Sequence, residues 1–195
     1  MQSTAHESYT NRLITIEKAW WRKILDPQIP YRWFLKRQSP GFMLEIGCGL
    51  GRNLLNNGGR GVGLDHNPNS VSIARDRGLT AMTPDEFEGS RFNIHGKYDS
   101  LLFSHVLEHM SYQDALKLVS KYMPYVKNGG KIIIICPQHA GFMSDKTHIE
   151  YFDLDKMNRL MIEVGLSPKE GTSFPFPAFM GAKFNYNEWV AIGQV

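Results

Sequence analysis

Three glycines at alternate positions, Gly47, Gly49 and Gly51, directly follow an apolar run in the segment LEIGCGLGRNLL at residues 44–55. Glycine lets the backbone turn tightly and lets a ligand approach it without interference from a Cβ atom. A strand followed by such a loop and the start of a helix presents backbone N–H groups to a bound molecule. The segment therefore predicts a strand, a loop and a helix built around a cofactor.

Apolar segments of strand length alternate with amphipathic helical segments along most of the chain. We expect strands at residues 41–47, 60–65, 79–82, 98–104 and 130–136, and two further strand-like stretches near 166–174 and 184–193. We expect helices at residues 11–25, 67–78, 111–126 and 152–165, a helical turn or two at 31–38, and a polar loop at 137–149. This alternation predicts an α/β domain with helices on both faces of a mostly parallel sheet.

The composition is that of a soluble globular protein with one domain. The 195 residues are 42% hydrophobic and 21% charged, which is ordinary for this class. The first ten residues lack the layout of a secretory signal, and no apolar run approaches the roughly 20 residues of a membrane span. Cys48 and Cys136 both end apolar runs, so we expect reduced thiols in a cytoplasmic protein.

The net charge of +3 is too small to suggest a nucleic-acid partner. Residues 1–40 contain seven Lys or Arg and three Asp or Glu, and the difference of +4 accounts for the whole excess. We interpret these charges as a solvated helix face. Attraction to an acidic substrate or to a membrane surface is the alternative.

Two cofactor classes use a glycine loop of this kind, namely the nicotinamide or flavin dinucleotides and S-adenosylmethionine. Asp65 ends the second expected strand and is placed to bind the ribose hydroxyls of either one. The dinucleotide pattern is G-x-G-x-x-G, and the third glycine here comes one residue early. Glu45 is a poor neighbour for a diphosphate but suits an ammonium group. The chain also lacks a Tyr-x-x-x-Lys pair and is too short for a separate substrate domain.

Four motifs resemble those of the class I S-adenosylmethionine-dependent methyltransferases, particularly the bacterial small-molecule group. They are LEIGCGLGRN, GVGLDHNPNSVSIAR, YDSLLFSHVLEHM and VKNGGKIIIICPQ, and the resemblance covers about residues 40–165. It implies a Rossmann-like seven-stranded, mostly parallel sheet with helices on both faces and a C-terminal antiparallel hairpin. It also implies an N-terminal helical lid or cap segment at residues 1–40 and a methyltransferase domain at residues 41–195.

The resemblance also assigns cofactor contacts, mostly at the ends of the strands. Glu45, Gly47, Cys48, Gly49 and Gly51 would surround the methionine part, and Asp65 would bind the ribose with His66 and Asn67 beside it. Asp85, Glu86 or Phe87 would flank the adenine, and Ser104 and His105 would close over the methionine and the sulfonium. The segment TPDEF at residues 83–87 departs from the family pattern, in which an acid directly follows the third strand. The product would be S-adenosylhomocysteine.

Methyl transfer from a sulfonium is an in-line displacement, so the protein must align the acceptor and, for a hydroxyl, remove a proton. Histidine is the usual base because its pKa lies near neutrality. His139 and His148 follow the fifth strand, where acceptors of this family approach, and they are the catalytic candidates, with Tyr151 a weaker one. His105 and His109 share the segment HVLEH, but its order differs from the zinc motif His-Glu-x-x-His, so we expect no metal site.

A small molecule is the expected acceptor. No Asn/Asp-Pro-Pro-Tyr ends the fourth strand and no strong basic patch is present, so methylation of a nucleic-acid base is not favoured. The apolar loop at residues 175–183 is the candidate wall of an acceptor pocket. Four aromatic residues could form a lid, although we prefer packing of the first helices onto the sheet for most of them: Trp20, Trp21, Trp33 and Phe34.

The prediction is therefore methyl transfer to an oxygen or nitrogen of a small metabolite. Two alternatives stay open at this point. One is a nicotinamide-dependent reductase, and the other is a protein that binds S-adenosylmethionine without transferring its methyl group, because a fold of this kind hosts many functions.

Overall fold

The computed structural model describes residues 28–195, which belong to two compact units divided between Asn93 and Ile94. The described residues form seven strands: β1 (Met43–Ile46), β2 (Gly61–Leu64), β3 (Ala81–Met82), β4 (Tyr98–Ser104), β5 (Val126–Pro137), β6 (Ser167–Phe174) and β7 (Glu188–Gln194). They lie in one sheet in the order β3-β2-β1-β4-β5-β7-β6. This order, parallel except for the antiparallel hairpin near the C-terminus, confirms the predicted Rossmann-like α/β fold. The helix expected at residues 11–25, with Trp20 and Trp21, lies outside the described residues. Within residues 28–195, none of the helices has the length and apolar character that crossing a membrane requires.

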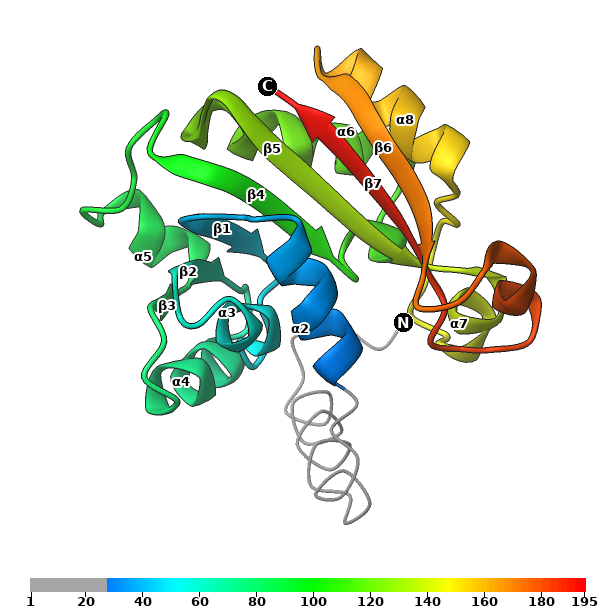
Figure 1. Cartoon of the computed structure of the whole chain (residues 1–195). Coiled ribbons are helices and arrows are strands. Elements are labelled where there is room, and N and C mark those ends of the chain that lie inside the picture. The colour runs from blue at the N-terminus through cyan, green and yellow to red at the C-terminus, as the bar shows by residue number, and fades with distance from the viewer. Residues whose placement is uncertain (1–27) are drawn as a thin grey trace. The chain divides into compact units, whose positions relative to one another are not determined.

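The first unit contains three parallel strands connected by helices (Figure 1). The strands are β1 (Met43–Ile46), β2 (Gly61–Leu64) and β3 (Ala81–Met82), and the helices are α2 (Gln28–Arg37), α3 (Arg52–Asn56), α4 (Pro68–Asp76) and α5 (Pro84–Glu88). Strand β2 lies between β1 and β3. Every residue of the three strands is buried, as is usual for parallel strands that helices cover on both faces.

Helix α2 is the part of the expected N-terminal cap that the structure describes. Phe34 is buried at 7% exposure, whereas Trp33 is 59% exposed. Helix α2 contacts α3, so Phe34 packs within the first unit, as we preferred for these aromatic residues. The division of the chain at residue 40 stays a prediction.

Polar side chains determine where α4 and α5 begin. The side-chain oxygen of Asn67 accepts a hydrogen bond from the Asn69 N–H at 3.0 Å. Thr83 and Glu86 form a capping box, in which each side chain accepts the backbone N–H of the other residue. Such caps satisfy N–H groups that the first helical turn leaves unpaired. Because both helices begin within a few residues of a strand, the connecting segments lie at the carboxyl ends of β2 and β3.

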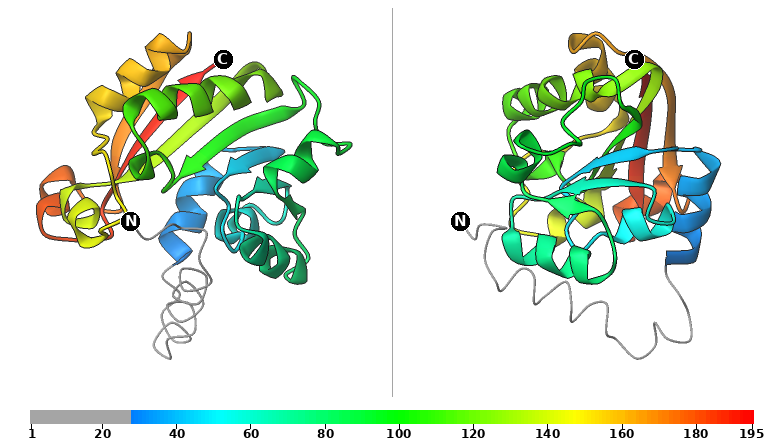
Figure 2. Two further views of the ribbon diagram at one scale, coloured as in Figure 1. Left: turned by 180° about the vertical axis from the view of Figure 1, so that it is seen from behind. Right: turned by 90° about the vertical axis from the view of Figure 1, so that its left-hand side faces the viewer.

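The second unit contributes four strands of the sheet, in the order β4-β5-β7-β6. The strands are β4 (Tyr98–Ser104), β5 (Val126–Pro137), β6 (Ser167–Phe174) and β7 (Glu188–Gln194). The helices are α6 (Tyr112–Tyr122), α7 (His139–Ser144) and α8 (Leu154–Glu163), and three short 3-10 helices are η2 (Leu107–His109), η3 (Met123–Tyr125) and η4 (Ala178–Ala182). Strand β5 pairs parallel with β4 and antiparallel with β7. Helices α6 and α8 cover the same face of these strands (Figure 2).

The elements of the second unit differ from the expected ones at two places. The helix expected to reach residue 126 ends at Tyr122, and β5 already begins at Val126. Pro124 explains the early end, because a proline lacks the N–H that an α-helix needs and its ring clashes with the preceding turn. The second difference is α7, a six-residue helix inside the expected polar loop at residues 137–149.

Candidate functional site

The glycine loop of the first unit connects β1 to α3. Its glycines Gly47, Gly49 and Gly51 have φ angles of 72°, 51° and 79°, a left-handed conformation that glycine adopts without steric cost. The residues between them, Cys48 and Leu50, are buried at 6% and 3% exposure. The loop is therefore anchored by two apolar side chains, while its glycines supply the backbone conformation that the tight turn requires.

The N–H groups of this loop are already bonded within the protein. The carbonyl oxygen of Leu64 accepts hydrogen bonds from Gly47 at 2.8 Å and Cys48 at 2.9 Å. Gly51 donates to the Cys48 carbonyl at 2.8 Å, and the N–H of Gly49 is bound by a carboxylate. The expectation that the loop presents free N–H groups is therefore wrong for these four residues. A diphosphate, which depends on such donors, loses this source of attraction.

The carboxylate that binds Gly49 belongs to Asp65, the residue directly after β2. Oδ2 accepts the Gly49 N–H at 2.8 Å, and Oδ1 accepts the Asn67 N–H at 2.9 Å. His66 is half-exposed, with its Nδ1 3.8 Å from Asp65 Oδ1. Each carboxylate oxygen can accept more than one hydrogen bond. Asp65 thus fixes the loop to the start of α4 and keeps acceptor capacity for hydroxyl groups of a ligand.

Glu45 lies in β1, two residues before the first loop glycine, and is 1% exposed. Its Oε1 accepts a hydrogen bond from Asn53 Nδ2 at 2.7 Å, whereas its buried Oε2 accepts none from the described residues. Burial raises the pKa of Glu45 to about 8, against the opposing effects of the Asn53 bond and the Arg52 charge. A buried acceptor without a donor is costly. A cationic N–H donor of a ligand would satisfy it.

The three residues expected near an adenine have different environments. Phe87 is buried at 1% exposure. Glu86 belongs to the capping box and accepts a hydrogen bond from Arg75 at 2.7 Å, and its bonds to Thr83 and Arg75 hold the pKa of Glu86 below its ordinary value. Asp85 is exposed in the first turn of α5. Helix capping and core packing thus account for Glu86 and Phe87, while Asp85 and Glu86 are both exposed.

In the second unit, His105 directly follows β4 and has a φ of 57°, which is uncommon for a residue other than glycine and is often found at functional sites. Its Nε2 lies 2.8 Å from Glu188 Oε1, and its Nδ1 lies 3.2 Å from Glu108 Oε1. Burial lowers the pKa of His105, but the charges of Glu188 and Glu108, together with the hydrogen bond to Glu188, outweigh this and raise it to about 10. An imidazolium can donate hydrogen bonds but cannot act as a base. The cofactor contacts expected for His105 and Ser104 stay predictions.

The other histidines of interest lie near α7. His139 begins this helix and is exposed, with its ring edge-on to that of Tyr151 at 6.2 Å. His148 donates from Nδ1 to the Phe142 carbonyl at 2.7 Å, so the neutral ring has an unprotonated Nε2. The rings of His148 and His109 are 4.8 Å apart. The structure thus brings together two histidines that are distant in sequence.

Three polar residues of this unit were missed by the sequence reasoning. Asn187 is fully buried, donates to Gln138 Oε1 at 3.2 Å and accepts the Phe176 N–H at 2.9 Å. Gln138 is also buried, and Asn187 binds the backbone of the loop at residues 175–183, called the aromatic loop below. Glu188, the partner of His105, is the third. The available signal was the pair Asn187–Glu188 at the start of an otherwise apolar strand.

Gly51→Ala is expected to destabilise the first unit more than Gly58→Ala. A Cβ on Gly51 would lie 2.2 Å from Leu79 Cδ1, whereas nothing lies within 4 Å of one on Gly58, and φ is positive at both positions. The backbone cost of about 1–2 kcal/mol applies to both variants. Overpacking adds about 1–3 kcal/mol at Gly51 alone. Denaturant unfolding followed by circular dichroism measures the two losses, and equal losses would contradict the steric argument.

Known proteins share the sequence pattern and the fold of this chain. A family model described as a methyltransferase domain matches residues 22–170. No curated protein matches the sequence. Among solved structures, an S-adenosylmethionine-dependent methyltransferase from Archaeoglobus fulgidus is 17% identical, with a TM-score of 0.68 over 94% of this chain and 99% of that chain.

Two further solved structures are similarly close. Magnesium protoporphyrin IX methyltransferase from Synechocystis PCC 6803, with bound SAH, is 14% identical, with a TM-score of 0.69 over 98% of this chain and 96% of that chain. A possible histamine N-methyltransferase from Thermotoga maritima is 16% identical, with a TM-score of 0.67 over 97% of this chain and 99% of that chain. At these identities the likeness shows the fold alone.

Proposed function

The chain belongs to the family of methyltransferase domains, and we propose that it transfers a methyl group from S-adenosylmethionine to an oxygen or nitrogen atom of a small molecule. The family membership confirms the resemblance seen in the four sequence motifs and removes the nicotinamide-dependent reductase as an alternative. The cofactor supplies a methyl group made electrophilic by its sulfonium. The protein must bind that cofactor and align the acceptor with it.

The cofactor assignment rests on which hydrogen-bonding groups at the glycine loop are already bonded within the protein and which are not. Four N–H groups of the loop are bonded within the protein, and beside them Glu45 Oε2 is a buried acceptor without a donor from the described residues. This arrangement suits a cationic ligand better than a diphosphate. S-adenosylmethionine carries an ammonium group, which Glu45 would hold, and ribose hydroxyls, which Asp65 would bind.

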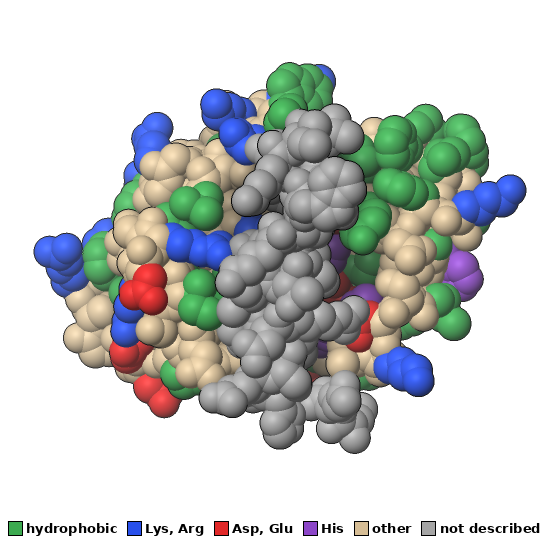
Figure 3. Space-filling view, turned by 90° about the horizontal axis from the view of Figure 1, so that it is seen from below, with side chains coloured by type: hydrophobic (Ala, Val, Ile, Leu, Met, Phe, Trp, Pro, Cys, Tyr) green, Lys and Arg blue, Asp and Glu red, His purple; other side chains and the backbone are tan. Residues whose placement is uncertain are grey.

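Support for an acceptor with an apolar body comes from the aromatic loop of the second unit and the neighbouring α7. Four large hydrophobic side chains here are 45–75% exposed: Met143, Phe176, Phe179 and Tyr186. Figure 3 shows hydrophobic side chains gathered on this part of the surface. Exposed apolar patches often mark binding sites. His139, on the same helix as Met143, is the proposed base, and His148 is proposed to contact the acceptor through its unprotonated Nε2.

His139→Ala is expected to lower methyl transfer to a hydroxyl acceptor by about 10²–10⁴-fold, the usual contribution of a general base, and to leave cofactor affinity within about twofold. The measurement is transfer of isotope-labelled methyl to a panel of phenols, carboxylic acids and amines, with calorimetry for the cofactor. His95→Ala, which removes another exposed histidine of the second unit, is the matched control. Undiminished transfer by His139→Ala would remove its role as the base. Tight cofactor binding with no transfer to any acceptor would favour a binding protein.

A further inference from the structure

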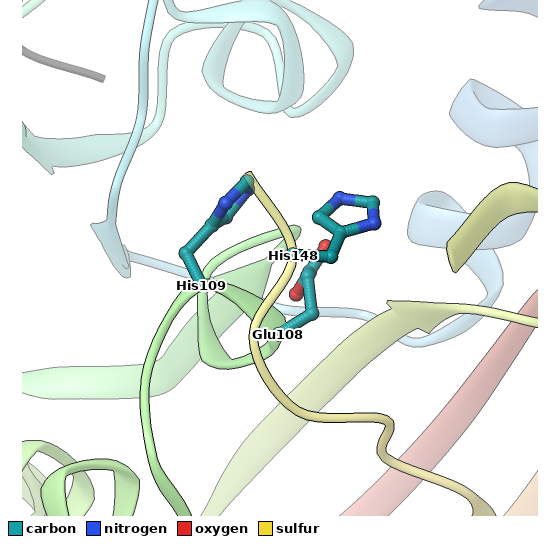
Figure 4. Close-up of side chains that lie close together, drawn as sticks. All are labelled: Glu108, His109 and His148. Carbon is teal, nitrogen blue, oxygen red and sulfur yellow. The ribbon is translucent and has the colours of Figure 1, made fainter. Parts of the chain in front are cut away.

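Glu108, His109 and His148 of the second unit bring one carboxylate and two imidazoles together (Figure 4). One candidate ligand atom from each lies within 4.8 Å of the others. We propose that these three residues form a binding site for a divalent transition-metal ion of the Zn²⁺ type. This inference departs from the expectation of no metal site and does not depend on the proposed methyl transfer.

Glu108 provides the first argument, because it is fully buried and its carboxylate keeps acceptor capacity beyond its contact with His105. It has 0% exposure, and neither of its oxygens accepts a hydrogen bond from the described residues. Its charged neighbour is His105, whose Nδ1 lies 3.2 Å from Oε1. A buried carboxylate with unused lone pairs is a ready ligand for a cation.

The two imidazoles are oriented as metal ligands usually are, with the second ring nitrogen held by a neighbouring group. His148 donates from Nδ1 to the Phe142 carbonyl at 2.7 Å. His109 Nδ1 lies 3.2 Å from the Thr147 hydroxyl, which itself donates to Asp145 at 2.8 Å and so accepts from His109. In the neutral form of each ring, Nε2 is therefore the nitrogen left for a ligand.

The backbone holds these residues together without help from an ion. The carbonyl oxygen of Glu108 accepts the Ile149 N–H at 2.7 Å and the Glu150 N–H at 3.2 Å. The loop that carries His148 is thereby fastened to η2, which carries the other two residues. A site on a fixed scaffold loses little entropy when it binds its ligand.

The nitrogen and oxygen atoms that the three side chains offer determine which metal ions the site favours. Two imidazole nitrogens and one carboxylate oxygen suit zinc and its transition-metal neighbours, whereas Ca²⁺ and Mg²⁺ prefer oxygen ligands alone. Zinc binds nitrogen at about 2.0–2.1 Å, which brings its ligand atoms closer together than the 4.8 Å found here, so the three side chains would move toward one another when the ion binds. Three protein ligands leave one position open for water or for an acceptor oxygen. A bound ion would occupy Nε2 of His148, so His148 would then reach the acceptor through the ion and not directly, and His139 would remain the base.

The test uses the full chain, freed of metal with a chelator and titrated with Zn²⁺ or Co²⁺ in equilibrium dialysis. We expect one ion per chain, together with a visible Co²⁺ spectrum that reports histidine ligands. His109→Ala and His148→Ala should each weaken binding by about a hundredfold, a loss at the upper end of what removal of a supporting residue costs. His95→Ala, which removes a histidine that packs on Tyr125, should leave it unchanged.

Two results would overturn this proposal. One is wild-type protein that binds no ion at micromolar Zn²⁺, and the other is an affinity that stays the same in both ligand variants. Circular dichroism shows whether each variant is folded, and His109→Gln replaces any alanine variant that is not. No cofactor or acceptor is present in these titrations, so failure of the proposed methyl transfer leaves their outcome unaffected.

Discussion

Asp65→Ala is expected to abolish calorimetrically detectable binding of both S-adenosylmethionine and S-adenosylhomocysteine. The substitution removes the proposed acceptor for the ribose hydroxyls, and it also releases the N–H groups of Gly49 and Asn67, which the carboxylate binds at 2.8 and 2.9 Å. Hydrogen bonds to a charged group contribute about 1.5–3 kcal/mol each. The variant loses the bonds to the ribose and also the two bonds that hold the loop in shape for the cofactor. Its affinity for both ligands should therefore fall by more than about a hundredfold.

Asp76→Ala is the matched control for this experiment, because Asp76 is an exposed acid at the end of α4 in the same unit. It should bind both ligands as the wild type does. Thermal unfolding of Asp65→Ala, read alongside calorimetry, shows whether the loop variant is still folded. Folded Asp65→Ala with wild-type affinity would overturn the placement of the cofactor at the glycine loop.

The fold was predictable because its signals are local. The apolar run before Gly47, the Asn67–Pro68 start of α4 and the isoleucines of β5 each determine an element within a few residues of sequence. The early end of α6 was also predictable from the sequence, since Pro124 lies inside the segment that we expected to be helical. That error came from following the amphipathic pattern past a residue that cannot continue it.

The chemistry of the candidate site was less predictable because it depends on contacts between distant residues. The bond between His105 and Glu188 joins residues 83 positions apart, and His109 meets His148 only because the loop before α8 folds back onto η2. The glycine spacing predicted a tight loop between the first strand and a helix, yet it could not show that the Leu64 carbonyl and Asp65 bind three of the loop N–H groups. Those partners come from the neighbouring strand and are visible only in three dimensions.

Glu45→Gln is expected to stabilise the protein at alkaline pH. The pKa of Glu45 is about 8 in the folded chain and 4.5 as its ordinary value, so between these values the folded state keeps a proton that the unfolded state has lost. The stability of the wild type therefore falls as the pH rises from 4.5 through 8. Glutamine has the same shape and no charge to bury. Its advantage should grow over this range to a few kcal/mol.

Denaturant unfolding at several pH values measures the free energy of unfolding of Glu45→Gln and of the wild type. The control is Glu88→Gln, at an exposed acid of the same unit, which should show no stability gain that grows with pH. A stability difference between Glu45→Gln and the wild type that does not change with pH would contradict the raised pKa.

The same substitution should weaken cofactor binding, which separates the functional role of Glu45 from its cost to stability. In the wild type, an ammonium group on Oε2 favours the carboxylate, so binding should release a proton and strengthen from about pH 6 to about pH 8. Calorimetry in buffers of different ionisation enthalpy measures that proton. Glu45→Gln should bind at least about tenfold more weakly at alkaline pH, with no proton released. A more stable variant that binds with unchanged affinity would show that the buried carboxylate does not hold the ammonium group.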